Sequence, residues 1–324
     1  MESMRQGTTQ PVSLPPQTFA KPPIRLSLVF SHTRRSYICA AQIGYGVHTL
    51  SASSERVCGL VLPKNEVRGT LLPDVGWMDK LKTLCLPGNG LFGPLPEAWS
   101  SLTSLKTLDL SSNTITGALP AKFFTAAAPH NTRNGGRGDH SSGLRTLSLA
   151  HNQLTGNIPH TISFLVGLTT LDISDNNLSG PLPSGITYCR ALRFLRLNNN
   201  MLSGPLPHEG FGNLTRLASL EIEGNKLTGA IPKDLPRSLR RLHLSNNRLE
   251  RDVPRQLYQC SALADISLSS NYLSGPVSDD VINLKGLRVF HLDNNRHTEQ
   301  DRAIIIESVA AFLPNLVAQK GFRI

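Results

Sequence analysis

The stretch Leu168–Pro183, LTTLDISDNNLSGPLP, decides the fold of this chain of 324 residues. Apolar and polar residues alternate in its first half, and Asn176 then precedes a second apolar segment that ends in a Leu-Pro pair. Similar stretches recur along the chain, most of them 24 residues apart, and begin at Val57, Leu81, Leu105, Leu144, Leu168, Leu192, Leu217, Leu239, Leu263 and Leu287. A period of this length predicts a solenoid, in which each unit packs only against its neighbours.

An asparagine follows every predicted strand at the same register. The column consists of Asn65, Asn89, Asn113, Asn152, Asn176, Asn200, Asn225, Asn247, Asn271 and Asn295. The chain turns at this position, and the backbone groups that leave the sheet need hydrogen-bond partners inside the protein. Because a side-chain amide both donates and accepts, we expect a structural asparagine ladder between successive turns.

The segment after most of the asparagines follows a second consensus pattern, Leu-x-Gly-x-Leu/Ile-Pro, as in Leu91–Pro96 and Leu178–Pro183. This pattern resembles the plant-type class of leucine-rich-repeat proteins, over about three quarters of the chain. Pro96–Leu105, PEAWSSLTSL, also looks like leucine-rich-repeat surface proteins of trypanosomatid parasites. The resemblance implies an α/β solenoid, a leucine-rich-repeat horseshoe of about ten repeats. Its concave side would be a parallel β-sheet, and its convex side would consist of short strands, turns and 3-10 segments.

The segments before the repeats lack this period. Residues 1–36 are rich in Pro, Ser, Thr and Arg, which predicts a disordered N-terminal arm. Residues 37–56 are expected to form an N-terminal cap, because Gly46-Val47 and Arg56-Val57 resemble the cap of plant-type proteins. The tryptophan and second cysteine of that cap are missing here, so the pairing of Cys39 stays open.

The solenoid is expected over residues 57–298, with a polar loop insertion at 125–142. Residues 299–324 should form a C-terminal helical cap, because Ala303–Phe312 has helical apolar spacing and stops before Pro314. Such a cap covers the last turn of a solenoid, which would otherwise expose its core.

The candidate partner site follows from strand alternation, because the residues that flank the core leucines point to the concave face. The first repeats offer mostly small residues there, whereas repeats six to eight offer an aromatic residue among charged ones. These candidates are Phe194, Arg196, Glu221, Glu223, Arg241 and His243. An aromatic residue beside arginines is the composition that anchors interfaces. The alternative is that the charges pair with one another across strands, which stabilises an exposed surface little.

These features predict a non-catalytic protein–protein interaction module, a scaffold, adaptor or receptor-like protein that binds a protein or peptide on its concave face. The chain is expected to be a monomer in isolation. A net charge of +10 leaves an alternative open, polyanion or nucleic-acid binding through an arginine-rich patch at 237–255. Nucleic acid is the less favoured partner, because no zinc-finger spacing, KH-type loop or RNP-like aromatic motif occurs.

No phosphate-binding loop, kinase signature, HExxH or GxSxG motif occurs, so we expect no enzyme, no cofactor and no metal site. Cys189 and Cys260 stand where other repeats have leucine, which indicates buried apolar side chains. The sequons at Asn177 and Asn213 leave glycosylation open, because the repeat consensus itself generates them.

Neither a secretory signal nor a stretch of membrane-spanning length is visible. The compartment is therefore unknown. The chain as given predicts a cytoplasmic protein, and an incomplete N-terminus would instead allow a cell-surface or secreted one.

Overall fold

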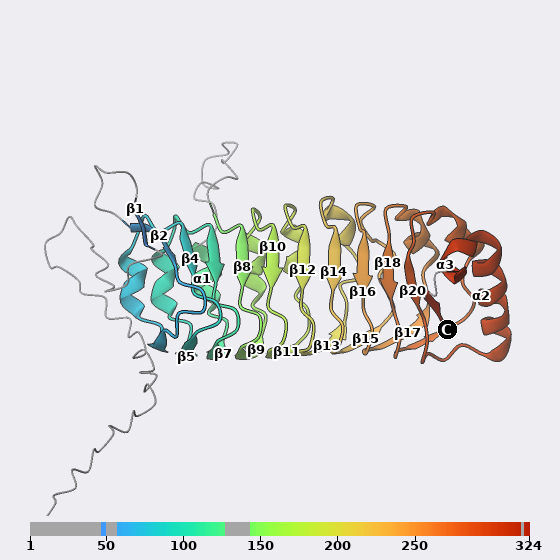
Figure 1. The fold of residues 1–324 in the computed structure, drawn as a ribbon, viewed down its shortest axis with the longest axis horizontal. Coiled ribbons are helices and arrows are strands. Elements are labelled where there is room, and N and C mark those ends of the chain that lie inside the picture. Colours follow the sequence, from blue (N-terminus) through green and yellow to red (C-terminus); the bar gives the residue numbers. More distant parts are fainter. Residues whose placement is uncertain (1–46, 50–56, 127–142, 319–320) are drawn as a thin grey trace, which may run out of the picture.

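A computed structural model describes residues 47–49, 57–126, 143–318 and 321–324 (Figure 1). The expected arm over residues 1–36, almost all of the expected cap over 37–56 and most of the insertion over 125–142 lie outside the described residues. The repeats stand side by side in one elongated row, and each contributes one strand to a long sheet (Figure 1). The predicted solenoid with a parallel sheet is therefore confirmed.

The main sheet has twelve strands within the described residues. Its members, in spatial order, are β1 (Val47–Thr49), β2 (Val57–Val61), β4 (Thr83–Cys85), β6 (Thr107–Asp109), β8 (Thr146–Ser148), β10 (Thr170–Asp172), β12 (Phe194–Arg196), β14 (Ser219–Glu221), β16 (Arg241–His243), β18 (Asp265–Ser267), β20 (Val289–His291) and β21 (Phe322–Arg323). The strands from β2 to β20 pair in parallel and belong to the ten predicted repeats. The end strands β1, which is antiparallel, and β21, which is parallel, were not predicted.

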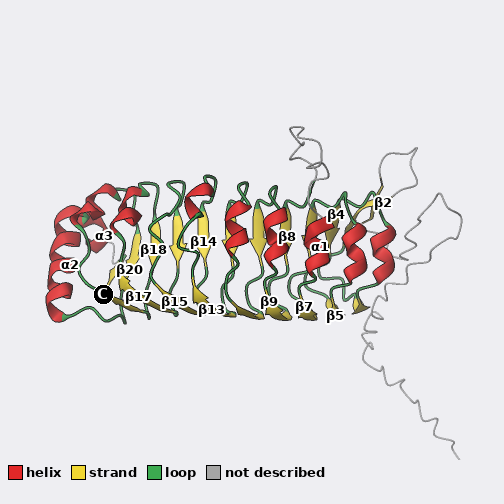
Figure 2. Cartoon of the chain, turned by 180° about the vertical axis from the view of Figure 1, so that it is seen from behind, coloured by secondary structure: helices red, strands yellow, loops and turns green. Residues whose placement is uncertain are grey.

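A second sheet and a row of short helices complete each turn. The second sheet consists of β3 (Arg68–Thr70), β5 (Gly90–Pro94), β7 (Thr114–Ala118), β9 (Gln153–Asn157), β11 (Asn177–Gly180), β13 (Met201–Pro205), β15 (Lys226–Gly229), β17 (Arg248–Asp252) and β19 (Tyr272–Ser274). The 3-10 helices are η1 (Pro73–Trp77), η2 (Glu97–Ser101), η3 (His160–Phe164), η4 (Ser184–Tyr188), η5 (Phe211–Asn213), η6 (Arg255–Gln259) and η7 (Asp279–Asn283). Seen from behind, the helices lie across the back of the main sheet (Figure 2).

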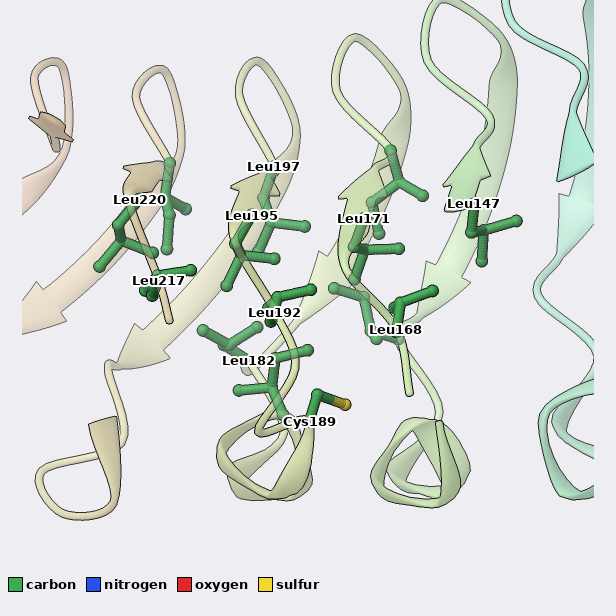
Figure 3. Close-up of a cluster of buried hydrophobic side chains, with 14 of the residues drawn as sticks. Leu147, Leu168, Leu171, Leu182, Cys189, Leu192, Leu195, Leu197, Leu217 and Leu220 are labelled. Carbon is green, nitrogen blue, oxygen red and sulfur yellow. The ribbon is translucent and has the colours of Figure 1, made fainter. Parts of the chain in front are cut away.

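The core runs along the whole row as stacked layers of leucine and isoleucine (Figure 3). Leu192, Leu195 and Leu197 of one repeat are fully buried beside the equivalent residues of the next. Cys189 and Cys260 are also fully buried, and burial raises the pKa of Cys189 to about 12 and that of Cys260 to about 11. Both thiols are therefore neutral packing groups.

The asparagines link successive turns. The Asn176 Oδ1 atom accepts the Leu154 N–H at 2.9 Å, and its Nδ2 donates to the carbonyls of Leu149, Ile173 and Ser174 at 2.9–3.2 Å. The same arrangement, with Oδ1 toward the preceding turn, recurs at Asn89, Asn113, Asn152, Asn200, Asn225, Asn247, Asn271 and Asn295. Each amide thus satisfies buried backbone groups that have left the sheet.

One backbone position favours glycine, because it has a left-handed conformation. Gly180 has a φ of 73°, and a Cβ atom there would lie 2.4 Å from Asn157 Oδ1. The equivalent position in repeat eight is occupied by Arg251, with a φ of 69°. An L-residue is strained in this region, so repeat eight keeps the turn at an energetic cost.

The described parts that flank the insertion leave the main sheet unbroken. The chain forms α1 (Ala121–Ala126) where other repeats have a 3-10 helix, and it enters β8 after Gly143. Strands β6 and β8 pair directly, with Thr107 opposite Thr146. Asn152 also reaches back to the Ile115 N–H at 2.9 Å, as in repeats of normal length.

The C-terminal segment folds as α2 (Glu299–Phe312), α3 (Pro314–Ala318) and β21. Helix α2 starts earlier than the apolar spacing of its sequence indicates, because Thr298 and Asp301 form a capping box at its N-terminus. This end is not purely helical, since β21 adds to the main sheet beside β20. Phe322 and Phe290 then have ring centroids 6.1 Å apart.

Candidate functional site

Two columns of side chains lie on the outward face of the main sheet. The column at the last residue of each strand is Val61, Cys85, Asp109, Ser148, Asp172, Arg196, Glu221, His243, Ser267 and His291. The column two residues earlier is Gly59, Thr83, Thr107, Thr146, Thr170, Phe194, Ser219, Arg241, Asp265 and Val289. Both have the register that strand alternation predicts.

Charged side chains on β10 to β18 form a continuous series of ion pairs, which we call the charge ladder. Arg196 lies between Asp172 and Glu221, at 3.7 and 3.5 Å. Arg241 lies between Glu221 and Asp265, at 3.4 and 3.6 Å. Opposite charges therefore alternate across five neighbouring strands. The cross-strand pairing considered as an alternative from the sequence does occur.

Glu221 is the centre of the charge ladder and is 9% exposed. Burial alone would raise the pKa of this carboxyl group. The hydrogen bond from the Ser219 hydroxyl and the charges of Arg196 and Arg241 outweigh that effect, so the pKa lies below its ordinary value. Glu221 is consequently ionised at neutral pH and holds both guanidinium groups in place.

The two arginines of the charge ladder keep capacity for another partner. Their ion pairs use Nε and Nη1, at distances longer than those of strong charge-assisted hydrogen bonds. Among the described residues, no hydrogen bond engages Nη2 of Arg196 or Arg241. A guanidinium has five N–H donors, so each can still bind a carboxylate or a carbonyl.

Phe194 is half-buried rather than freely exposed. The guanidinium carbon of Arg196 lies 5.4 Å from the centre of its ring, and that of Arg193 lies 5.8 Å away. These contacts are within the range of cation–π interactions. The aromatic ring and the charge ladder therefore form one continuous surface.

His243 lies at the other end of the charge ladder, with its Nε2 atom 3.0 Å from Asp265. His291 occupies the same column two strands away. Burial lowers the pKa of His291, and Arg323 on β21 lowers it further. His291 is therefore neutral at physiological pH.

The structure changes the membership of the predicted site. It brings Phe194, Arg196, Glu221, Arg241 and His243 together, whereas Glu223 follows β14 and takes no part in the charge ladder among the described residues. The sequence-based prediction of the site missed three further residues, namely Asp172, Asp265 and Arg193. The two aspartates stand in the predicted outward columns, so the same alternation pointed to them.

The arginine-rich run at 237–255 does not form one patch. Arg241 is part of the charge ladder on β16, whereas Arg248 and Arg251 are in β17 of the second sheet. Arg255 begins η6 and forms an ion pair with Asp280. The run is thus divided among β16, β17 and η6, and polyanion binding through it stays a prediction.

Two further features concern possible cofactors and membranes. Among the described residues, no group of three His, Cys, Asp or Glu side chains is placed to hold a metal ion. Within the same part of the chain, no helix is both long and apolar enough to cross a bilayer.

Sequence comparison identifies the repeats directly. Family models of leucine-rich repeats match residues 101–118, 142–202, 191–214 and 237–296. No curated protein sequence matches the chain.

Solved structures with similar folds come from plants and bacteria. The leucine-rich-repeat ectodomain of the Arabidopsis receptor kinase HAESA, in complex with an N-terminally extended IDA peptide hormone ligand, is 30% identical, with a TM-score of 0.65. The match covers 73% of this chain and 37% of that one. A plant ice-binding protein is 27% identical over 78% of this chain and 76% of its own, with a TM-score of 0.64. The Leptospira interrogans leucine-rich-repeat protein LIC12759 is 25% identical over 79% of this chain and 64% of its own, with a TM-score of 0.59.

The chain is much shorter than the receptor ectodomains that it matches. It spans 39% of the plant peptide hormone receptor RGFR1, solved in complex with RGF2, and 38% of a TDR receptor.

Proposed function

We propose that this chain, a leucine-rich-repeat protein with plant-type repeats, is a non-catalytic module that binds a protein or peptide on the outward face of its main sheet. The binding site comprises Phe194, Arg196, Glu221, Arg241 and His243. The charge ladder carries this proposal, because it is an ordered array of charges on the outward face of the main sheet, opposite the helix row.

The class of partner is supported by the similar receptor structures. The HAESA ectodomain was solved in complex with a peptide hormone ligand, and the plant peptide hormone receptor RGFR1 was solved in complex with RGF2. The plant ice-binding protein has a similar fold, so the repeat architecture alone does not assign a ligand. The assignment to a protein or peptide therefore rests on the chemistry of the face.

The chemistry of the face favours an extended polypeptide with both apolar and acidic groups. The half-buried ring of Phe194 offers apolar contact area, and the Nη2 groups of Arg196 and Arg241 offer donors for carboxylates or backbone carbonyls. Arginine and aromatic residues are enriched among the residues that dominate binding energy. Because the ladder carboxylates already fix the guanidinium groups, little side-chain entropy is lost on binding.

No catalytic role is assigned to the cysteine on this face. Cys85 lies at the end of β4, where burial and the neighbouring Asp109 raise its pKa. A raised pKa disfavours the thiolate that a nucleophilic cysteine needs. We therefore treat Cys85 as part of the surface rather than as a reactive group.

The test compares the variant Phe194→Ala/Arg196→Glu with Lys226→Glu, a control on β15 of the second sheet. Each protein is immobilised, exposed to native lysate, and the retained proteins are quantified by mass spectrometry. We expect the wild type and the control to retain the same partner, and the face variant to lose it while circular dichroism shows that it remains folded. Equal retention by the two variants would rule out this face as the site.

A further inference from the structure

The basic residues of this chain are concentrated along one side of the solenoid. We call this side the strand-entry edge, defined as the residues around the first leucine of each repeat, where the chain passes from the helix row into the main sheet. In Figure 3 this passage runs from Cys189 past Leu192 to Leu195. The edge comprises residues 79–82, 103–106, 143–145, 166–169, 190–193, 215–218, 237–240, 261–264 and 285–288.

The strand-entry edge accounts for the whole net charge of the protein. Its basic residues are Lys80, Lys82, Lys106, Arg145, Arg190, Arg193, Arg216, Arg237, Arg240, Lys285 and Arg288, and its one acidic residue is Asp79. The chain has 33 Lys and Arg residues and 23 Asp and Glu residues, which leaves 22 of each elsewhere. The remainder of the protein is therefore neutral, and the net charge of +10 belongs to this edge.

Backbone hydrogen bonds align these residues in one register. The Lys106 N–H donates to the Lys82 carbonyl at 2.8 Å, and the Arg145 N–H donates to the Lys106 carbonyl at 2.8 Å. The series continues without interruption through Thr169, Arg193, Ala218, Arg240, Ala264 and Arg288. Six basic residues thus stand in a single line from β4 to β20, with strands about 4.8 Å apart.

A second row of basic residues lies beside the C-terminal half of the line. Three repeats carry a basic residue two positions before the leucine as well as one position after it. These pairs are Arg190 with Arg193, Arg237 with Arg240, and Lys285 with Arg288. The pairs occur on every second strand, which gives a spacing of about 10 Å between pairs.

Carboxylates that would neutralise this charge are scarce on the edge. Lys80 pairs with Asp79 at 3.4 Å, whereas Arg190, Arg240 and Arg288 form no ion pair with another described residue. The arginines of the charge ladder, by contrast, each contact two carboxylates. Arg190, Arg240 and Arg288 are exposed, so the edge presents cations to solvent. A line of exposed cations attracts an anion that extends along it.

We propose that the strand-entry edge binds an extended, acidic polypeptide segment rich in Asp and Glu. The line from Lys82 to Arg288 spans eight strand intervals, or about 38 Å, which matches roughly twelve extended residues. Guanidinium groups favour carboxylates because their planar N–H groups can pair with both oxygens. The residues between the cations are Thr169, Ala218 and Ala264, which provide no aromatic surface for stacking nucleic-acid bases.

This inference goes beyond the proposed function, because it concerns a different surface and does not depend on the charge ladder. The two surfaces meet at Arg193, whose guanidinium group faces the ring of Phe194.

The test uses a fluorescein-labelled peptide of twelve alternating Asp and Glu residues and the full chain. Fluorescence anisotropy is measured for the wild type and for Arg190→Glu/Arg240→Glu/Arg288→Glu. We expect the Kd of the edge variant to rise about tenfold or more, and wild-type binding to weaken steeply as salt increases. The matched control is Lys226→Glu/Arg248→Glu/Arg251→Glu, which changes the net charge equally on the second sheet and should keep the wild-type Kd within about threefold.

Three outcomes would overturn the proposal. The first is an equal loss of binding in the edge variant and the control, since net charge alone would then explain it. The second is tighter binding of a twelve-nucleotide oligothymidylate than of the peptide, which would make the edge a nucleic-acid surface. The third is no measurable peptide binding by the wild type at low salt.

Two further variants separate this result from misfolding and from the main-sheet site. Arg190→Gln/Arg240→Gln/Arg288→Gln removes the charges without reversing them and should also weaken binding, with a melting temperature equal to that of the wild type. Phe194→Ala/Arg196→Glu should bind the peptide within about threefold of the wild type, because its changes lie off the edge. If the glutamine variant bound like the wild type, the edge assignment would fail.

Discussion

The outward face of the main sheet differs between its N-terminal and C-terminal halves. Strands β4, β6 and β8 present threonines beside a cysteine, an aspartate and a serine, whereas β10 to β18 present the charge ladder. Under both halves the buried leucines and the asparagine hydrogen bonds are the same, as at Asn113 and Asn200. The interior is fixed by the packing between turns, while the face varies without changing the strand register. Residues for stability and residues for recognition are therefore different sets.

The largest effect is expected from the interior, and it should be equal in the two halves. Asn113→Leu and Asn200→Leu each leave an N–H and three carbonyls without their amide partner. Unsatisfied buried polar groups cost about 1–3 kcal/mol each, so each variant should lose about 3 kcal/mol or more of unfolding free energy. Urea denaturation measures the loss. A near-neutral substitution in either half would contradict the idea of a common scaffold.

A smaller effect should distinguish the two faces. Glu221→Gln removes the central charge of the ladder and leaves Arg196 and Arg241 each with one carboxylate. We expect a loss of about 1 kcal/mol, since the carboxylate is buried but its partners are partly solvated. Ser148→Ala on the N-terminal half should stay within about 0.5 kcal/mol. Equal losses in the two variants would mean that the charge ladder contributes no stability.

The contribution of Glu221 to the unfolding free energy should also depend on pH. Its pKa in the folded state lies below the unfolded value of about 4.3, so its stabilising effect is complete above that value. The effect is lost as the pH falls through the folded pKa. The difference in unfolding free energy between the wild type and Glu221→Gln should therefore be constant at neutral pH and shrink below about pH 4. A difference that does not change down to pH 2 would exclude an ionic origin.

The smallest effect is expected in repeat eight, where a residue other than glycine occupies the left-handed position of the turn. Arg251 holds a left-handed conformation at a position where most repeats have glycine. Arg251→Gly removes that strain but adds freedom to the unfolded chain, which leaves a net gain of about 0.5 kcal/mol. A rise of about 1–2 °C in melting temperature would confirm it. A lower melting temperature would mean that the Arg251 side chain stabilises β17 by more than the strain it introduces.

The parts of the fold that repeat were predictable from the sequence. The leucine and asparagine columns recur at one period, so the ten parallel strands and their register followed from counting. Strand β21 was not foreseeable, because two residues carry no detectable pattern and only the return of the chain after α3 places them beside β20. Helix α2 was expected too late by four residues, because the start depends on the cap at Thr298.

The candidate site was predictable only in outline. Alternation placed Phe194 and Arg196 on the same face, but it does not determine which guanidinium lies against which carboxylate or ring. Proximity in sequence was misleading for the run at 237–255, because neighbours along one repeat point to different sides. The basic strand-entry edge shows the opposite case, since its members are about 24 residues apart in sequence and adjacent in space.

The asparagine ladder also determines the order in which the repeats of this protein should unfold. Among the described residues, each ladder amide from Asn89 to Asn295 bonds within its own turn and to the turn before it, so cooperativity passes from neighbour to neighbour. Opening should begin at the ends of the row and advance one repeat at a time. Amide hydrogen exchange would then be slowest in the middle repeats and increase toward both ends, independently of which residues the face carries.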